Sequence, residues 1–180
     1  MRLGRIRVLD DLTVNKIAAG EVVERPASVV KELVENALDS GAYSVHVSVV
    51  DGGRRSISVR DDGCGMSADD AVAAFARHAT SKSSGVDDLR GLTSYGFRGE
   101  ALASIASVAK VVLRTREHGA DEGTEVEVWG GKTVAQRPVG CPPGTEVVVA
   151  DLFYNVPARR KSVRSRATEL AHCKDVVVDF

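Results

Sequence analysis

The chain has 180 residues, which is enough for one domain, or for one domain and part of the next. Hydrophobic residues make up 43% and charged residues 27%, a balance typical of globular proteins and not of disordered or fibrous chains. The net charge of −1 argues against a strong overall attraction to nucleic acid, which leaves only a local basic patch as a route to DNA.

Two further features of the sequence indicate the cellular compartment of the protein. Apolar runs are short, and the N-terminus lacks the apolar segment of a signal peptide, so we expect a cytoplasmic protein. The three cysteines, Cys64, Cys141 and Cys173, have no metal-ligand spacing such as CxxC, and we expect reduced thiols.

The first third of the chain predicts helices followed by a β-hairpin. Ser28 could cap the second helix, and Gly41 would end it. Valines alternate with polar residues after that glycine, which is the periodicity of a strand. The elements expected here are helices over 11–19 and 26–39, a strand over 45–49, a turn at 51–53 and a strand over 56–60.

The rest of the chain predicts helices around a run of hairpins. The connection over 79–98 is long and rich in Ser, Thr, Gly and Asp, which is typical of a lid or binding loop. Without a regular βαβ rhythm, the pattern favours an α+β fold, a two-layer sandwich with helices on one face of a mixed, largely antiparallel sheet. The elements expected here are helices over 67–77, 101–106 and 158–178 and strands over 111–114, 124–129, 133–137 and 145–150.

The helix over 26–39 has a polar stripe opposite its apolar one. The apolar stripe consists of Val30, Leu33, Val34, Ala37 and Leu38, and the polar one of Glu32, Asn36 and Asp39 with Glu35 beside them. A solvated helix face would show the same periodicity. However, such a face usually places cations at i+4, and only Lys31 is near. Acidic groups with an amide suit a hydrated Mg²⁺ and an activated water.

Three shorter motifs are individually weak. Asp61 to Gly65 reads DDGCG directly after a strand, where a carboxylate could accept a hydrogen bond from an exocyclic amine, although a plain turn would look the same. The stretch 94–102 places Gly96 and Gly99 before a helix, whose free N–H groups would form an anion site. Residues 143–145 read PGT, a turn that enters a strand.

Taken in order, these pieces resemble the GHKL ATPases, the superfamily of type II topoisomerase ATPase domains, a heat-shock chaperone, sensor histidine kinases and MutL mismatch-repair proteins. The resemblance to MutL-type proteins covers nearly the whole chain, and the last two segments are specific for them. The segments that carry it are IAAGEVVERP at 17–26, DDGCG at 61–65, HATSK at 78–82, GFRGEAL at 96–102 and DLFYNVPARR at 151–160.

The resemblance implies a role for each matching residue. Glu32 would be the general base on the attacking water, and Asn36 would be the protein ligand of Mg²⁺. Asp61 would receive the adenine amino group, Gly65 would let the backbone pass the base, and Thr145 would support the adenine contact through water. The remaining nucleotide contacts implied are Thr80, Ser81 and Lys82 near the ribose and phosphates, and Gly96, Phe97, Arg98 and Gly99 in a lid over the phosphates. Lys82 could equally be solvated, and Arg98 could instead pin the lid by a salt bridge. Glu35 and Asp39 match motif positions that would either support the site residues or be structural.

The resemblance also implies partners and further domains. Residues 1–180 would be the N-terminal GHKL ATP-binding domain, followed in the family by a transducer domain, which supplies a lysine to the γ-phosphate, and a dimerisation domain. The expected function is a Mg²⁺-dependent ATPase switch of DNA mismatch repair, homodimeric in the full-length protein, which contacts DNA weakly and works with mismatch-recognition and downstream repair proteins. The basic run over 159–166 would contact DNA backbone or form a solvated helix face.

Two alternatives stay open. One is a topoisomerase-type or chaperone-type ATPase of the same fold, against which the segment at 151–160 argues. The other is a nucleotide-gated interaction module with negligible turnover, against which Glu32 argues as a candidate general base.

Overall fold

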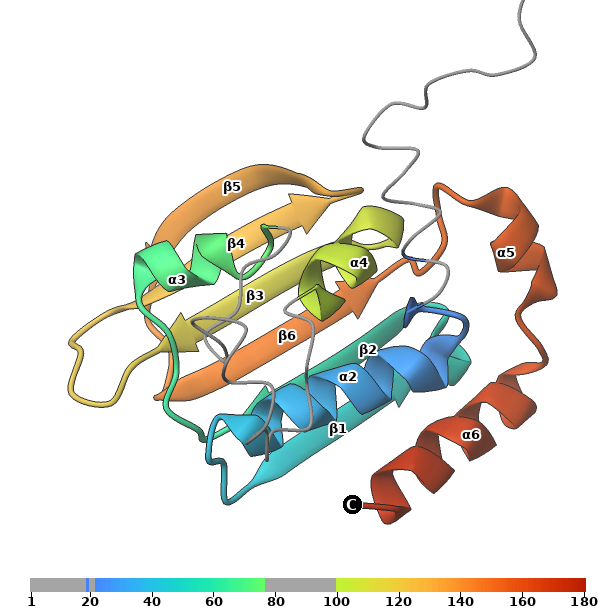
Figure 1. Ribbon diagram of the computed structural model, residues 1–180, viewed down its shortest axis with the longest axis horizontal. Helices are drawn as coiled ribbons and strands as arrows, with labels where there is room; N and C mark the ends of the chain where they lie inside the picture. The colour runs from blue at the N-terminus through green and yellow to red at the C-terminus, as the bar shows by residue number, and fades with distance from the viewer. Residues whose placement is uncertain (1–18, 20–21, 77–99) are drawn as a thin grey trace, which may run out of the picture.

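The computed structural model describes residue 19 and residues 22–76 and 100–180. A six-stranded sheet in the order β1-β2-β6-β3-β4-β5 forms one layer, and every pairing within it is antiparallel. Helices α2, α3 and α4 lie on one face of the sheet, and α6 lies beside α2 (Figure 1). The predicted α+β sandwich is therefore confirmed. The strands are β1 (Val45–Val50), β2 (Ser56–Asp61), β3 (Lys110–Arg116), β4 (Gly123–Trp129), β5 (Lys132–Val139) and β6 (Gly144–Ala150).

Helix α2 (Pro26–Asp39) begins one turn earlier than a Ser28 cap would require. Arg25 occupies the N-cap position with an extended backbone, and Pro26, whose ring fixes a helical φ, is the first helical residue. The prediction that Ser28 caps the helix is therefore wrong. At the other end Gly41 has a φ of +75°, and its N–H bonds to Leu38 O at 3.0 Å. This left-handed glycine ends the helix as predicted.

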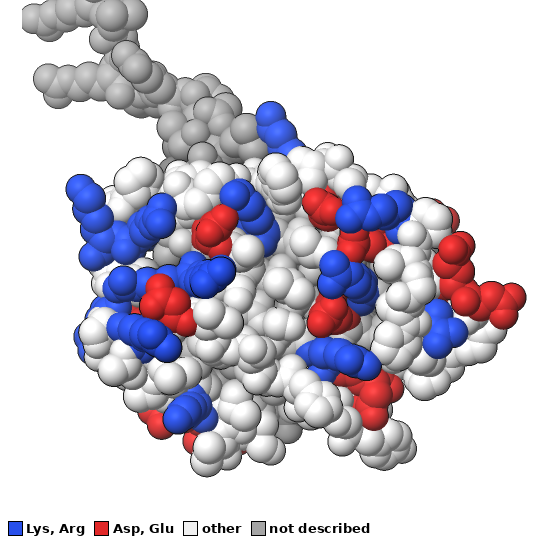
Figure 2. Space-filling model, turned by 180° about the vertical axis from the view of Figure 1, so that it is seen from behind, with Lys and Arg blue, Asp and Glu red and all other residues white. Residues whose placement is uncertain are grey.

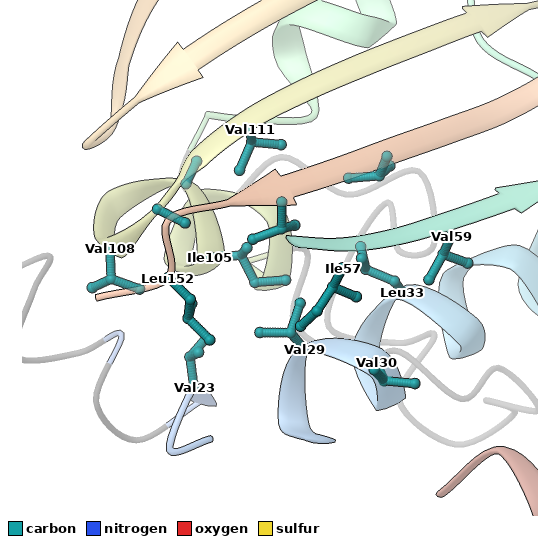
Figure 3. Close-up of a cluster of buried hydrophobic side chains, with 14 of the residues drawn as sticks. Val23, Val29, Val30, Leu33, Ile57, Val59, Ile105, Val108, Val111 and Leu152 are labelled. Carbon is teal, nitrogen blue, oxygen red and sulfur yellow. The ribbon is translucent and has the colours of Figure 1, made fainter. Parts of the chain in front are cut away.

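The core lies between the helix layer and the sheet. Val29 and Leu33 of α2 point toward Ile57 of β2, and Val23 lies against Leu152 (Figure 3). All five of these side chains are buried. Strand alternation explains why: the odd-numbered residues of β2 and β3 face the helices, and burial of their apolar area stabilises the sandwich by about 25 cal/mol per Å².

The remaining helices follow local capping signals. Helix α3 (Ala68–Ala73) begins after Ser67, whose hydroxyl accepts the N–H of Asp70, and it ends before the predicted boundary near 77. Helix α4 (Ala101–Val108) is slightly longer than predicted. The single helix expected over 158–178 is wrong, because α5 (Pro157–Ser162) ends at an extended Val163 and α6 (Arg166–Val178) starts anew. Ser165 caps α6 by accepting the N–H of Thr168.

The three cysteines are free thiols, with Cys64 exposed and Cys173 buried. Burial, and then the nearby Glu169 carboxylate, raise the pKa of Cys173 to about 11. The helices formed by the described residues are all too short or too polar to cross a membrane.

Candidate active site

Four polar side chains form a row across the helix-facing side of the sheet, at one end of it. Asp61 of β2 lies opposite Thr145 of β6, which lies opposite Thr115 of β3, which lies opposite Thr124 of β4. Two residues away on each strand, toward the middle of the sheet, the same face carries only core side chains: Val59, Val147, Leu113 and Val126. The row therefore marks where the core ends and a polar site can begin. The C-terminal end of α2 and the loop that leads to α3 lie at the same end of the sheet (Figure 1).

Asp61 is nearly buried, with 9% of its surface exposed. Its Oδ1 accepts the N–H of Gly63 at 2.9 Å and has a longer contact of 3.5 Å from the Ser40 hydroxyl. Burial raises the pKa of Asp61, and the N–H groups of Gly63 and Thr145 oppose that rise only in part. A carboxylate that is nearly buried at the edge of the core is a strong acceptor for a ligand's N–H group.

The neighbouring carboxylate of Asp62 has a structural role. Its Oδ1 accepts the N–H groups of Tyr43 at 2.8 Å and Ser44 at 2.9 Å, just before β1. The N–H of Ser44, and next that of Tyr43, hold the pKa of Asp62 below its ordinary value against the opposing effect of desolvation. Of the two consecutive aspartates, only Asp61 faces the site.

The two glycines of the DDGCG segment are required by the protein's own packing. Gly65 has a φ of +71°, and a Cβ there would clash with the carbonyl oxygen of Arg116 on β3. A Cβ on Gly63 would clash with the Ser40 side chain at the end of α2. The loop is thus pressed between α2 and β3, which fixes the position of Asp61. Sequence analysis assigned Gly65 to an approach to the base, and that contact stays a prediction.

Thr115 is a residue of this site that sequence analysis missed. It is fully buried, and its Oγ1 lies 2.9 Å from Met66 N, 3.0 Å from Gly144 O and 3.0 Å from Thr145 Oγ1. It therefore ties the end of the Asp61 loop to β6. Its position in the alternation after Val111 and Leu113 would have placed it on the core face, although nothing local indicates its partners.

The polar stripe of α2 leads along the helix toward Asp61. Glu32, Asn36 and Ser40 are spaced four residues apart, and residues at this spacing lie on neighbouring turns of one face. Ser40 contacts Asp61, so Asn36 lies one turn from it and Glu32 two turns. Both are half-buried. The structure thus brings five of the predicted functional residues to one region: Glu32, Asn36, Asp61, Gly65 and Thr145.

Glu35 does not belong to this stripe. It is 8% exposed and lies 3.7 Å from the Nζ of Lys31, one turn before it. This placement favours a structural role for Glu35.

Comparison with known proteins decides which family this arrangement belongs to. Residues 24–136 match the model of the histidine kinase-, DNA gyrase B- and HSP90-like ATPases. The chain belongs to this GHKL ATPase family. It is 54% identical over 97% of its length to the DNA mismatch repair protein MutL of Pelotomaculum thermopropionicum, and 56% identical over 99% to that of Solibacter usitatus. It spans only 29% and 27% of the length of these two curated relatives.

Solved structures agree with the MutL-type resemblance. The Aquifex aeolicus MutL ATPase domain complexed with ADP is 38% identical, with a TM-score of 0.67 over 87% of this chain and 54% of that one. The N-terminal domain of a DNA repair protein is 28% identical, with a TM-score of 0.77 over 91% of this chain and 47% of that one. The predicted MutL-type GHKL ATPase domain is thereby confirmed.

Several of the nucleotide contacts expected for a GHKL ATPase lie outside the described residues, as does the lid predicted over 79–98. They are Thr80, Ser81, Lys82, Gly96, Phe97, Arg98 and Gly99. The described part of the site consists of the polar row, the DDGCG loop and the stripe of α2.

The MutL-type segment over 151–160 holds the fold together near α4. Phe153 is fully buried with a φ of +63°, and its N–H bonds to Val108 O at 2.7 Å. The Asn155 amide donates to Ser107 O at 2.9 Å. Arg159 donates to Val23 O at 2.9 Å and lies 5.9 Å from the Phe153 ring. The segment that is most specific for MutL-type proteins thus has a packing role within this chain.

The basic run over 159–166 therefore divides in two. Arg159 is half-buried and stabilises the fold through its hydrogen bond to Val23 O, a contact that does not depend on any ligand. The other cations of the run are exposed on α5, in the connection to α6 and at the start of α6: Arg160, Lys161, Arg164 and Arg166.

Proposed function

We propose that this chain binds and hydrolyses ATP, and that it serves as an ATPase switch of DNA mismatch repair. The observation that carries the proposal is the site formed by the polar row, the DDGCG loop and the stripe of α2, which we call the end-of-sheet site. In it a buried carboxylate, Asp61, lies at the end of the helix stripe that contains Glu32 and Asn36. It is supported by the similarity to a MutL ATPase domain described as complexed with ADP.

Asp61 would hold the adenine. Its carboxylate is fixed by the Gly63 N–H and has acceptor capacity left for an exocyclic amine. Thr145 lies directly opposite on β6 and would support the same edge of the base, through water. Gly65 would allow the chain to pass the base, and the loop contacts with Met66 and Ser40 keep Asp61 in place.

Glu32 and Asn36 would act at the other end of the nucleotide. The Glu32 carboxylate would accept the proton of the attacking water, the task of a general base. The amide oxygen of Asn36 is a hard ligand that fits Mg²⁺, which needs one or two protein oxygens when phosphates and water complete its shell. When bound, that ion neutralises phosphate charge, while Asn36 positions it and Glu32 orients the water.

The phosphates would be closed off by residues outside the described part. We propose that Thr80, Ser81 and Lys82 lie near the ribose and phosphates, and that N–H groups of residues 96–99 contact the phosphates in a closed lid. Hydrogen exchange over 79–98, compared with and without ATP, tests the lid. Equal protection in the two states would contradict it.

In the full-length protein, ATP would close the lid and join two N-terminal domains, so that mismatch recognition is coupled to strand incision. The chain spans less than a third of the length of its curated relatives, so we propose this dimerisation and these repair partners for the longer protein. Within this chain, DNA contact would be weak and sequence-independent, through the exposed cations Arg160, Lys161, Arg164 and Arg166. Replacing Lys161 by Ala should lower the salt dependence of DNA binding, and replacing Ser162 should not.

ATP turnover measured beside ATP affinity tests the proposal directly. Binding with hydrolysis above the uncatalysed rate supports the ATPase. Binding without any turnover, even in a longer chain, would favour a nucleotide-gated module. A chain that binds no adenine nucleotide would contradict both.

A further inference from the structure

The buried hydroxyl of Thr115 has one proton and three close polar neighbours. Met66 N lies 2.9 Å away, Gly144 O 3.0 Å and Thr145 Oγ1 3.0 Å. Two of these neighbours have fixed roles, because a backbone N–H can only donate and a carbonyl oxygen can only accept. The N–H of Met66 therefore donates to Thr115, and the single Thr115 proton goes either to Gly144 or to Thr145.

Only one of the two arrangements makes all three contacts hydrogen bonds. If Thr115 donated to Thr145, its oxygen would face the Gly144 carbonyl oxygen at 3.0 Å with no proton between them. Such a pair is repulsive, and it is costly around a hydroxyl as fully buried as that of Thr115. If Thr115 donates to Gly144, the Thr145 hydroxyl donates to Thr115 and every contact is satisfied.

This arrangement determines what Thr145 can offer to a ligand. Its one proton is committed to Thr115, so only its lone pairs remain. Asp61, directly opposite on β2, also presents acceptor oxygens when ionised. The two neighbouring groups at this end of the sheet are therefore both acceptors.

We propose that Thr115 is a positioning residue that sets the hydrogen-bond polarity of the base site, and that it thereby selects 6-aminopurine over 6-oxopurine nucleotides. The proposal rests on the proposed ATP-binding function. Adenine donates from its 6-amino group to Asp61, and a water that donates to Thr145 has its second proton left for adenine N1. Hypoxanthine has a carbonyl in place of the amine and a proton on N1, so it mismatches both groups.

The test compares the affinities of ATP and ITP, whose bases differ only at this edge. The wild-type chain should bind ATP at least ~10²-fold more tightly, as expected for a site with buried polar groups left unpaired by the wrong ligand. Thr115→Val keeps the shape but removes the hydroxyl, so the Thr145 proton is free to turn toward the ligand. The ATP-to-ITP ratio should then fall by ~10-fold, about the value of one hydrogen bond.

Two control variants separate this role from simple packing. Thr115→Ser keeps the hydroxyl and should keep the wild-type ratio of ATP affinity to ITP affinity. Ser107→Ala removes a buried hydroxyl that bonds within α4, outside the site, and it should leave both affinities unchanged. In a Thr145→Val background, adding Thr115→Val should change the ratio no further, because Thr115 acts through Thr145.

Several outcomes would overturn the proposal. An unchanged ratio of ATP to ITP affinity in folded Thr115→Val, or the same loss in Ser107→Ala, would contradict it while ATP binding itself stands. If Thr115→Val does not fold, Thr115→Ala tests the same loss without a clashing methyl. Equal wild-type affinity for ATP and ITP would also overturn it. A wild-type chain that binds neither nucleotide would contradict the proposed function as well.

Discussion

At the scale of single residues, the structure separates two consecutive aspartates by their partners. Asp61 is nearly buried and faces the end-of-sheet site, whereas Asp62 is exposed and holds the N–H groups that precede β1. Composition and spacing could not distinguish them, because both follow the same strand. The difference is set by strand alternation, which turns Asp61 toward the helix layer and Asp62 away from it.

Asp61→Asn should abolish adenine-nucleotide binding in a folded chain. The amide can present its NH₂ group to the adenine amine, which leaves a buried donor unpaired at a cost of ~1–3 kcal/mol or more. Calorimetry with ATP measures the loss. Asp62→Asn is the matched control, because its side-chain oxygen can still accept from Tyr43 and Ser44. Unchanged ATP affinity in folded Asp61→Asn would show that the adenine assignment is mistaken.

Nucleotide affinity should depend on pH through Asp61. Burial raises the pKa of this carboxyl above its ordinary value of 3.8. Only the ionised form accepts from the adenine amine, so affinity should fall as pH drops through the raised pKa, before an ordinary aspartate would titrate. The same shift makes the folded state bind the proton more tightly than the unfolded state. Its contribution to stability is therefore largest at low pH and declines as pH rises through the raised pKa.

Titrations of ATP affinity in the wild-type and Asp62→Asn chains check this pH dependence. Both should lose affinity as the pH falls, and the variant should do so at slightly lower pH, because the Asp62 charge is a minor cause of the raised pKa of Asp61. If the loss disappears in Asp62→Asn, the titrating group is Asp62 and not Asp61.

Glu32→Ala and Asn36→Ala should have different effects. Loss of the general base should leave Mg·ATP binding intact and slow hydrolysis by roughly 10²–10⁴-fold. Loss of the amide should weaken ATP binding in the presence of Mg²⁺ and have little effect without it. Affinity with and without Mg²⁺, and single-turnover rates, distinguish the two. An equal loss of binding in both variants would refute this division of roles.

At the scale of elements, the sheet face opposite the helices is held together by ion pairs. Blue and red side chains lie beside one another across this face (Figure 2). Arg114 of β3 contacts Glu125 of β4 at 2.5 Å and Glu146 of β6 at 3.1 Å, and Arg137 of β5 also contacts Glu125. The side chain of Glu125 is only 3% exposed, so its carboxylate is paired with these arginines in place of water.

Arg114→Met should destabilise the fold by ~1–3 kcal/mol, because Glu125 loses a partner while its carboxylate stays buried. The double variant Arg114→Met with Glu125→Gln should recover part of this loss, since the buried charge is then removed as well. Urea unfolding measures both. If the double variant loses the full sum of the two single effects, the buried charge is not the cause.

Sequence reasoning succeeded where the signal is local. The valines over 45–49 and the end of α2 at Gly41 follow from side-chain alternation and from a glycine with positive φ. It failed at Ser28, where a proline at the first helical position already started the helix, and at 163–165, where a second cap interrupts the helix. It could not find Thr115, because its partners lie 29 to 49 residues away in the chain.

The candidate site divides in the same way. The motif at 61–65 and the stripe of α2 were found because each lies within one segment. Which residues the site brings together is decided by the register of β2, β6 and β3, and short-range patterns do not specify register between strands distant in sequence.

At the scale of the whole molecule, this 180-residue chain should hydrolyse ATP far more slowly than one that continues as its MutL relatives do. Glu32, Asn36 and Asp61 are all present, so the base, metal and adenine contacts can form. The family resemblance assigns a further cation at the γ-phosphate to a following domain, and charge neutralisation there carries much of the catalysis of phosphoryl transfer. Lid closure would also lack the surface against which it packs, so the closed state would be sparsely populated and apparent affinity reduced by that fraction. Turnover per site and light scattering, measured on both chains, provide the test. The shorter chain should be slower and monomeric. Comparable rates per site would mean that the 180-residue chain is already catalytically complete.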